Sequence, residues 1–280
     1  TIYLLLAIGL KGGVKLSSAP FAQIWQPALL AVLLCVLIPL LAYLVLRRFG
    51  GFDLTNAAAI AAHYGSVSAV TFSEAQAFLD AQGVPYEGFM PSMLAIMEIP
   101  AILVALFLVK HKQKPGSGMK KVVHELLTGK GTLLLVGGLA IGWISGKKGL
   151  DQFGPLFDAP FRGILMLFLL EVGIVTGRRI GDLRQVGAFL VVFGVIFPVA
   201  CAAATMPMAK LAGLSAGGAM IFATLAASAS YIAAPSAIRI ALPEASPAYY
   251  LTASLVITFP FNIAVGLPLY LTAARILYGA

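Results

Sequence analysis

Residues 62–71 read Ala-His-Tyr-Gly-Ser-Val-Ser-Ala-Val-Thr, and residues 226–236 read Ala-Ala-Ser-Ala-Ser-Tyr-Ile-Ala-Ala-Pro-Ser. Each stretch interrupts an apolar segment with small hydroxyl residues and a Gly or Pro, which loosen a helix. In hydrocarbon such a break persists only where protein or a water-filled cavity satisfies the exposed peptide groups. Two breaks at matching places in two halves of a chain indicate the substrate site of a secondary transporter. The alternative is two serine-rich helices whose hydroxyls bond to their own carbonyls.

Composition indicates the solvent in which this chain folds. The sequence is 60% hydrophobic and 11% charged, with a mean hydropathy of +0.96. Soluble domains are roughly 45–50% apolar and about 25% charged. The chain is therefore predicted to be an all-α, multi-pass membrane protein. Its net charge of +8 lies mostly at helix ends, which is typical of a topology signal rather than of a nucleic-acid-binding surface. Cys35 and Cys201 lie inside apolar segments and are interpreted as packing residues.

The apolar pattern predicts nine segments, two of them broken. They cover approximately residues 1–16, 28–46, 53–80 (broken at 65–68), 90–109, 131–145, 161–177, 186–206, 215–242 (broken at 228–235) and 249–270. Gly9 and Gly13 form a small-residue face suited to close helix packing, and a link with Pro20 and Pro27 precedes the second segment. Residues 110–130 carry six lysines and are interpreted as a cytoplasmic loop with a short amphipathic piece at 119–128. A contact with anionic lipid or with a protein is the alternative.

An internal repeat relates the two halves with an offset near 160 residues. Residues 60–71 fall on 221–232, Pro39 on Pro198, and Pro85 on Pro247. The predicted organisation is a first repeat at 1–109, the basic loop at 110–130 and a second repeat at 131–280. An odd number of crossings per half inverts one repeat relative to the other. Because the first half shows four crossings and the second five, we expect five plus five, with the first helix upstream of Thr1.

Basic residues predict the orientation. The pairs Arg47-Arg48 and Arg178-Arg179 fall on the same side as the lysine loop, which places that side in the cytoplasm. Lys147 and Lys148 then lie outside, against the trend.

The breaks suggest a chemistry. Helix N-termini expose N–H groups and a partial positive charge, so they suit a small oxyanion, whereas carbonyl, hydroxyl and carboxylate oxygens suit Na⁺. The predicted substrate-binding residues are Gly65, Ser66, Val67, Ser68, Ser228, Ser230, Tyr231 and Pro235. The predicted ion-binding residues are Thr71, Glu98, Ser236, Thr258, Asn262 and Glu171. No cofactor is expected beyond Na⁺ as a coupling ion.

Two carboxylates lie deep in apolar segments, where an ionisable residue is a functional candidate because its burial is costly. They are Glu98 and Glu171. Glu171 could instead form a structural pair with Lys11. His63, beside the first break, is interpreted as a buried histidine with its hydrogen bonds satisfied rather than as a proton carrier.

Several short motifs resemble the SbtA-type sodium-dependent bicarbonate transporters. They are Gly65-x-Val67-Ser68-x-x-Thr71, Val84-Pro85-Tyr86-Glu87, Glu98-Ile99-Pro100-Ala101, Phe161-Arg162-Gly163, Arg179-Ile180-Gly181-Asp182-Leu183-Arg184, and Ser228-x-Ser230 followed by Pro235 and Arg239. The resemblance covers nearly the whole chain. It implies ten helices in inverted repeats, a homotrimer in the bacterial inner membrane, sodium-coupled uptake of bicarbonate, and control by a small PII-like cytoplasmic protein.

The chain departs from that pattern at two positions. Tyr231 stands where these transporters carry Asp after the serine run, and Glu98 stands in place of another Asp. A phenol is neutral at physiological pH, so the sodium coupling and the identity of the anion are open at this point. Tyr231 could also face lipid or a neighbouring helix and change nothing.

Other functional classes fit less well. The sequence has no Gly-x-Ser-x-Gly elbow, no His-Glu-x-x-His pair and no phosphate-binding loop of the Walker type, so an enzyme is not expected. A channel can also use broken helices, but the duplication favours a carrier of a small anion.

Overall fold

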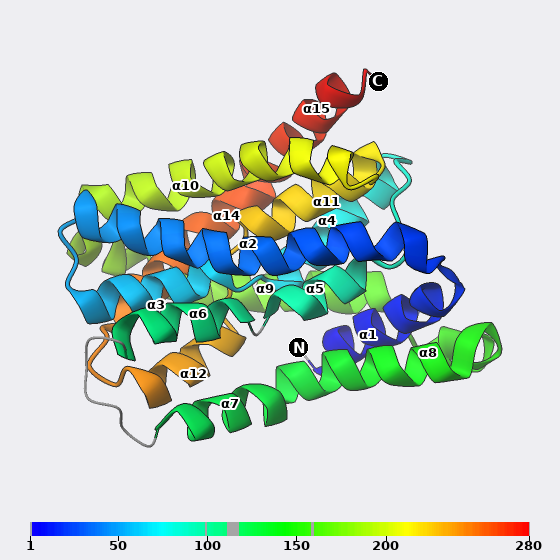
Figure 1. Ribbon diagram of the computed structural model, residues 1–280, viewed down its shortest axis with the longest axis horizontal. Helices are drawn as coiled ribbons and strands as arrows, with labels where there is room; N and C mark the ends of the chain where they lie inside the picture. Colours follow the sequence, from blue (N-terminus) through cyan, green and yellow to red (C-terminus); the bar gives the residue numbers. More distant parts are fainter. Residues whose placement is uncertain (1, 99, 111–117, 158–159, 280) are drawn as a thin grey trace.

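The computed structural model describes residues 2–98, 100–110, 118–157 and 160–279, and in these residues the chain is helical without strands (Figure 1). Its first half contains α1 (Ile2–Ser18), α2 (Phe21–Arg48), α3 (Leu54–Gly65), α4 (Ala69–Ala81), α5 (Met90–Glu98), α6 (Pro100–Lys110) and α7 (Gly118–Thr128). Its second half contains α8 (Lys130–Phe157), α9 (Phe161–Arg178), η1 (Ile180–Asp182), α10 (Leu183–Leu211), α11 (Ala216–Ala227) and α12 (Ala233–Ala241). The C-terminal helix consists of α13 (Pro247–Leu251), η2 (Thr252–Thr258), α14 (Phe259–Phe261), η3 (Asn262–Gly266) and α15 (Leu267–Tyr278).

Five helical stretches of the described chain are long and apolar enough to cross a membrane. They are Phe21–Arg48, Met90–Leu108, Gly154–Arg178, Ile180–Leu211 and Pro247–Tyr278. The outer faces of α2 and α9 leave large apolar side chains exposed, among them Leu29, Leu44, Leu167 and Leu170. Such surfaces are stable against lipid rather than water. The chain is therefore an integral membrane protein, as its composition predicts.

The small-residue face predicted on α1 packs against α8. A Cβ added to Gly9 would meet the backbone of Leu135 and Gly138, and one added to Gly13 would meet the backbone of Leu139. Small residues at an interface let two backbones approach closely, which is how membrane helices gain packing energy. The prediction for Gly9 and Gly13 is confirmed, and the two helices lie side by side (Figure 1).

Two predicted boundaries, at the start of α2 and at the end of α8, are wrong. The predicted link before residue 28 is helical, because α2 already begins at Phe21 and contains Pro27. An interior proline removes one backbone hydrogen bond, which surrounding helices tolerate inside a membrane protein. The segment predicted to end at Ser145 continues to Phe157 as α8. α8 changes direction at Gly146, because this residue has a φ of 58°, which few residues other than glycine adopt.

The broken segments occupy the interior. Every residue of α3 from Ala57 to Gly65 is buried, and so is every residue of α11 from Gly217 to Ala227. The long helices cover them, α2 lying against α3 and α10 against α11. Side chains also cap the first turns, since Asp53 accepts the Asn56 N–H at 2.9 Å and Ser215 accepts the Gly218 N–H at 3.2 Å.

The C-terminal helix is continuous from Pro247 to Tyr278, although the pattern predicts only 249–270. Two stretches within it, η2 and η3, have the wider π-helical winding. Such bulges frequently accompany functional sites. Both stretches carry a residue predicted to bind an ion, Thr258 in η2 and Asn262 in η3.

Candidate functional site

The two breaks lie against each other. The backbone N–H of Ser68 donates to the Ser228 hydroxyl at 2.9 Å. The N–H of Ser230 donates to the carbonyls of His63 at 2.7 Å and Ser66 at 3.1 Å. Residues 160 positions apart in the sequence are thus in direct contact, as expected from the matching places of the breaks. Peptide groups of the two broken segments thus bond to each other, which helps both breaks to persist in the interior.

Two helices begin at this contact, and serine side chains cap both. The Ser68 hydroxyl oxygen accepts the N–H of Thr71 in the first turn of α4 at 3.2 Å. The Ser230 hydroxyl oxygen accepts the N–H of Ala234 in the first turn of α12 at 3.3 Å. Each oxygen acts as an acceptor in these bonds, which leaves the hydroxyl hydrogen to donate to a further group. Two helix N-termini and two hydroxyl donors therefore come together, an arrangement suited to an anion.

A small cavity lies at this junction. Its free volume is about 10 Å³, which is roughly the space that one water molecule needs. The lining residues come from α1, both breaks, the first residues of α4 and α12, and the end of α5: Leu5, Val67, Ser68, Ala69, Glu98, Ser230, Tyr231, Ile232 and Ala233. Ser66 lies behind this lining and holds it to α5, because its hydroxyl donates to the Glu98 carbonyl at 2.8 Å.

Glu98 supplies a carboxylate to the cavity. The residue is only 7% exposed, and its Oε2 atom is buried without a hydrogen-bond partner among the described residues. Its Oε1 atom faces Gly131 at the start of α8, where an added Cβ would be 3.6 Å away. A buried, unpaired carboxylate is costly unless it binds a cation or a proton. The residue therefore fits a cation that binds and leaves.

Tyr231 also faces the cavity. Its hydroxyl is buried and close to Ser68, yet the two groups do not meet the geometry of a hydrogen bond in the described part of the chain. Its ring packs edge-on against Phe259 with the centroids 5.3 Å apart. The side chain thus fills space at the second break instead of pointing at lipid. It offers a neutral hydrogen-bonding group where a carboxylate would offer a charge.

Three other predicted site residues hydrogen-bond to backbone carbonyls. The Thr258 hydroxyl donates to the Gly194 carbonyl at 2.7 Å, and the Asn262 amide donates to the carbonyl of Ala227, the last residue of α11, at 2.9 Å. Ser236 bonds within its own helix, to Ala233. These three side chains do not line the cavity, so their binding of an ion stays a prediction.

The remaining predicted site residues also lie outside the cavity lining. Gly65 lies against the ring of Pro39, about 2.8 Å from where its Cβ would be, and Pro235 is buried in the first turn of α12. Thr71 is buried in the first turn of α4. Glu171 is exposed on α9, outside the cavity lining, with apolar neighbours such as Leu170 and Ile174 that are also exposed. The structure does not bring Glu171 to the breaks, and its role in ion binding is untested.

His63 is buried beside the first break and stacks on Tyr250 with the ring centroids 4.5 Å apart. Its Nδ1 atom lies 2.7 Å from the Ala59 carbonyl, so this nitrogen carries the hydrogen. The Nε2 atom has no partner in the described chain. The interpretation of a satisfied histidine is therefore correct for only one of the two ring nitrogens.

Two residues that join the halves were missed as site elements. Glu87, in the loop after α4, accepts the N–H of Ser215 at the start of α11 at 2.6 Å. Asn56, at the start of α3, accepts the N–H of Ser246 just before α13 at 2.8 Å. In each half, the loop after the broken segment thus bonds to the start of the first broken helix of the other half. The only signal in the sequence was the position of Glu87 beside Pro85 in a repeated motif.

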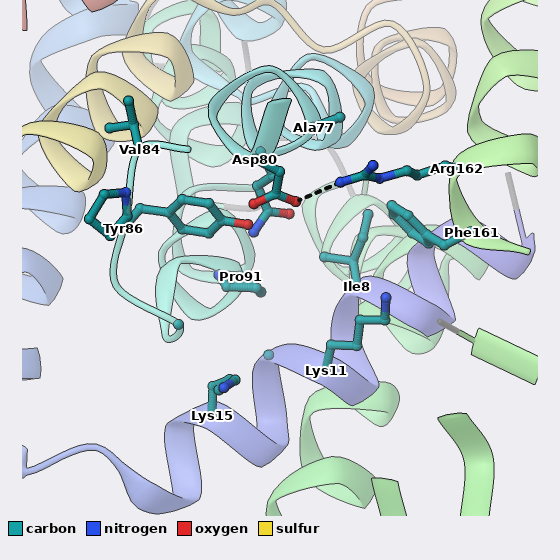
Figure 2. A pocket seen from close by; sticks show the side chains of 14 residues that line it. Ile8, Lys11, Lys15, Ala77, Asp80, Val84, Tyr86, Pro91, Phe161 and Arg162 are labelled. Carbon is teal, nitrogen blue, oxygen red and sulfur yellow. Dashed lines mark ion pairs between the residues drawn. The ribbon is translucent and has the colours of Figure 1, made fainter. Parts of the chain in front are cut away.

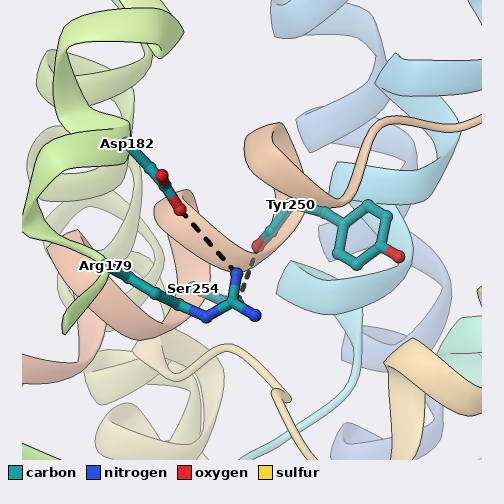
Figure 3. A network of polar contacts seen from close by, with 4 residues as sticks. All are labelled: Arg179, Asp182, Tyr250 and Ser254. Carbon is teal, nitrogen blue, oxygen red and sulfur yellow. Dashed lines mark hydrogen bonds and ion pairs between the residues drawn. The ribbon is translucent and has the colours of Figure 1, made fainter. Parts of the chain in front are cut away.

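A separate polar network lies outside the cavity lining, where α9 meets the C-terminal helix (Figure 3). Arg179 and Asp182 form an ion pair at 3.8 Å, and the Ser254 hydroxyl donates to the Tyr250 carbonyl at 2.7 Å. Ser254 is as deeply buried as the serines of the breaks. It therefore provides a matched control for substitutions at the cavity.

The fold and the site define a class of protein, an integral membrane transporter with two broken helices that meet at a polar cavity. The chain belongs to the Na⁺-dependent bicarbonate transporter superfamily, since the family profile matches residues 1–275. This match confirms the resemblance noted in the sequence. No curated protein matches the chain in sequence. Membership in a transporter superfamily agrees with the expectation that the chain is not an enzyme.

Proposed function

We propose that this protein takes up bicarbonate by sodium-coupled symport, with the anion bound where the two breaks meet. One observation carries the proposal: the N-termini of α4 and α12, the hydroxyls of Ser68 and Ser230, and the unpaired carboxylate of Glu98 face one cavity. The helix ends and hydroxyls supply donors for an oxyanion. The carboxylate supplies a ligand for the cation. Binding the two ions together neutralises groups that are costly to leave bare in a membrane interior.

The two halves are proposed to be inverted repeats that span 1–109 and 131–280. The contacts across the halves support this proposal, because Ser68 meets Ser228 at an offset of 160 residues. Two further bonds form a matching pair. Glu87, in the loop before α5, bonds to Ser215 at the start of α11, and Ser246, in the loop before α13, bonds to Asn56 at the start of α3. A substrate site between such repeats can be exposed to each side in turn by rocking one part against the other.

Further features of the proposal follow from the sequence and the family. The protein is proposed to lie in a bacterial inner membrane as a homotrimer, with the basic loop at 110–130 in the cytoplasm as a contact for a PII-like regulator. Within that loop, residues 111–117 lie outside the described residues. The amphipathic piece predicted at 119–128 is helical as α7.

A second candidate is a carrier of a small anion that is not coupled to Na⁺. Tyr231 favours it, because the cavity holds a phenol where a second carboxylate is expected from the resemblance. In that case Glu98 would carry a proton instead of accepting Na⁺. The two candidates differ in the driving ion but share the anion site.

Transport into proteoliposomes tests both candidates. Symport predicts saturable accumulation of labelled bicarbonate driven by an inward Na⁺ gradient, and loss of the Na⁺ dependence in Glu98→Gln. Accumulation driven by a pH gradient without Na⁺ would support the second candidate. Passive equilibration of bicarbonate, insensitive to either gradient, would indicate a channel and overturn both.

A further inference from the structure

The first turn of α8 lacks the side chains that usually stabilise the start of a helix. The first hydrogen bond of α8 runs from the Leu133 N–H to the Gly129 carbonyl at 2.9 Å. Gly129 is therefore the N-cap residue, and it has no side chain that could accept an N–H. The first turn also contains no acidic residue. The N–H groups of residues 130–132 thus have no partner within the helix, and this helix end carries a partial positive charge.

Other helices that begin at or near the breaks are capped by side chains of their own segments. Asp53 caps the start of α3, Ser68 the start of α4, and Ser230 accepts an N–H in the first turn of α12. The start of α8 differs from these three, because no residue of its own segment supplies an acceptor. An acid that faces this helix end would have to come from another helix.

Glu98, at the end of α5, faces the start of α8. A Cβ added to Gly131 would lie 3.6 Å from Oε1 of Glu98 and 3.7 Å from the side chain of Leu5. Glu98 is only 7% exposed, and its Oε2 atom has no hydrogen-bond partner among the described residues. A negative charge beside the first turn of a helix is stabilised, most strongly where the site is partly buried. The start of α8 thus offsets part of the cost of burying this carboxylate and leaves Oε2 for a cation.

Two helices hold the start of α8 in place. α8 packs against α1 along its length, and α7, which precedes α8, packs against α12 (Figure 1). Leu126 of α7 is 3% exposed and belongs to the same apolar cluster as Ala234 and Ile238 of α12. Only Gly129 separates α7 from α8. The helix end that faces Glu98 is therefore tied to the helix that follows the second break.

We propose that the first turn of α8 is part of the cation site and positions Glu98 for Na⁺. In this arrangement the helix end is the counter-charge of the carboxylate while no cation is bound, and Gly131 leaves the space that the carboxylate occupies. The inference rests on the proposed function and adds to it a positioning element outside both breaks. A symporter must also return its empty site across the membrane. A buried carboxylate with no counter-charge would make that step costly.

The size of the side chain at position 131 tests the proposal. Gly131→Val should displace the carboxylate and raise the half-saturating Na⁺ concentration for bicarbonate uptake by about three- to tenfold. The KM for bicarbonate should change less, and Gly131→Ala should have a smaller effect than Gly131→Val. Gly137→Val, on the same helix with nothing within 4 Å of an added Cβ, is the control. An unchanged Na⁺ dependence in Gly131→Val, or an equal rise in the control, would overturn the proposal.

A shorter carboxylate separates positioning from a general loss of packing. In Glu98→Asp the side chain is one methylene shorter, so it should no longer meet a valine at position 131. Adding Gly131→Val to Glu98→Asp should therefore change the half-saturating Na⁺ concentration by less than about twofold. If Gly131→Val has the same effect in both backgrounds, it acts through packing and the proposal fails.

A binding measurement separates this proposal from the proposed function. Binding of Na⁺ to the purified full chain can be followed by the line broadening of sodium NMR, and it should weaken in Gly131→Val but not in Gly137→Val. If this pattern is found and the protein transports no bicarbonate, the proposed function fails and the positioning role stands. If the protein transports bicarbonate with Na⁺ while both variants bind Na⁺ equally, the positioning role fails alone. No binding of Na⁺ by the parent would overturn both.

Discussion

The two breaks meet but differ in construction. The first leaves only Ser66, Val67 and Ser68 outside the helices, all of them buried, and Ser68 caps α4 from the N-cap position. The second leaves five residues outside the helices, Ser228–Ile232, and the N-cap residue of α12, Ile232, makes no side-chain hydrogen bond to the helix. Ile232 is 37% exposed. The first break is thus a compact, fixed part of the site, and the second is the part with room to vary.

This difference suggests that the two breaks have different roles in binding. A rigid element positions a ligand accurately, whereas a looser one adapts its shape to the ligand or changes between states. Tyr231, one of the two residues at which the sequence departs from the family pattern that it resembles, lies in the second break. We therefore expect substitutions in the first break to affect folding and transport together, and substitutions in the second to affect mainly the choice and coupling of ions.

The largest effect is expected for Gly65→Val in the first break. Its Cβ would lie 2.8–2.9 Å from three atoms of the Pro39 ring, so α2 and α3 would have to separate. Overpacking of this kind costs about 1–3 kcal/mol, and transport should be lost. The measurement is the melting temperature in detergent together with bicarbonate uptake. Gly137→Val, where nothing lies within 4 Å of an added Cβ, is the control, and equal melting temperatures would contradict the rigid packing of this break.

The next largest effect is expected for the serines of the two breaks, Ser68 and Ser230. Loss of one hydrogen bond to a bound ion costs about 1–3 kcal/mol, or roughly five- to a hundredfold in affinity. Ser68→Ala and Ser230→Ala should both raise the KM by such a factor. Ser68→Ala should also lower the melting temperature more than Ser230→Ala does, because Ser68 is the N-cap residue of α4 whereas Ser230 lies two residues before the N-cap residue of α12.

Ser254→Ala is the control for the serines, since the Ser254 hydroxyl is bonded within its own helix (Figure 3). Similar transport defects in all three variants would show that the serines act through folding rather than through binding.

A smaller effect is expected at Tyr231. Tyr231→Asp places a charge beside the cavity, and it should lower the half-saturating Na⁺ concentration by about three- to tenfold. Tyr231→Phe, which keeps the ring against Phe259, controls for size. If the parent already depends on Na⁺ as steeply as Tyr231→Asp, then this position does not set the coupling, and the second break would not be the adaptable side.

The smallest effect is expected for the N-terminal caps of α3 and α11, and it is an effect on the pH dependence of stability. Burial acts to raise the pKa of Asp53, but hydrogen bonds from Asn56 and Thr55 outweigh it and hold the pKa below its ordinary value of 3.8. The resulting stabilisation is complete above that value and is lost as the pH falls through the lower pKa of the folded state. The N-cap residue of α11, Ser215, offers a neutral hydroxyl instead of a carboxylate.

Asp53→Asn keeps the cap but removes the charge, at a cost of about 0.3–1 kcal/mol near neutral pH. We expect the melting temperatures of the parent and of Asp53→Asn to converge as the pH falls below 4. A difference that stays constant down to pH 3 would exclude this contribution.

The sequence alone determined the class of protein and the position of both breaks. Membrane helices are set by long apolar runs, because hydrocarbon forbids unsatisfied backbone, and this constraint acts locally along the chain. Ser68 and Ser230 could be identified for the same reason, since hydroxyl residues beside Gly or Pro interrupt such a run. The helix cap at Asp53 and the glycine face of α1 are likewise local patterns.

Only the tertiary structure decided which polar residues share a cavity. Glu98 and Glu171 look alike in the sequence, each a carboxylate deep in an apolar segment, but α5 directs Glu98 into the junction and α9 leaves Glu171 exposed. Thr258 and Asn262 donate to neighbouring backbone carbonyls, and a hollow of about 630 Å³ is lined by residues of α1, α4 and α9 that are up to about 150 positions apart (Figure 2). These outcomes depend on how the helices are rotated and packed. Side-chain contacts between distant segments fix that rotation, and the pattern of any single segment does not contain them.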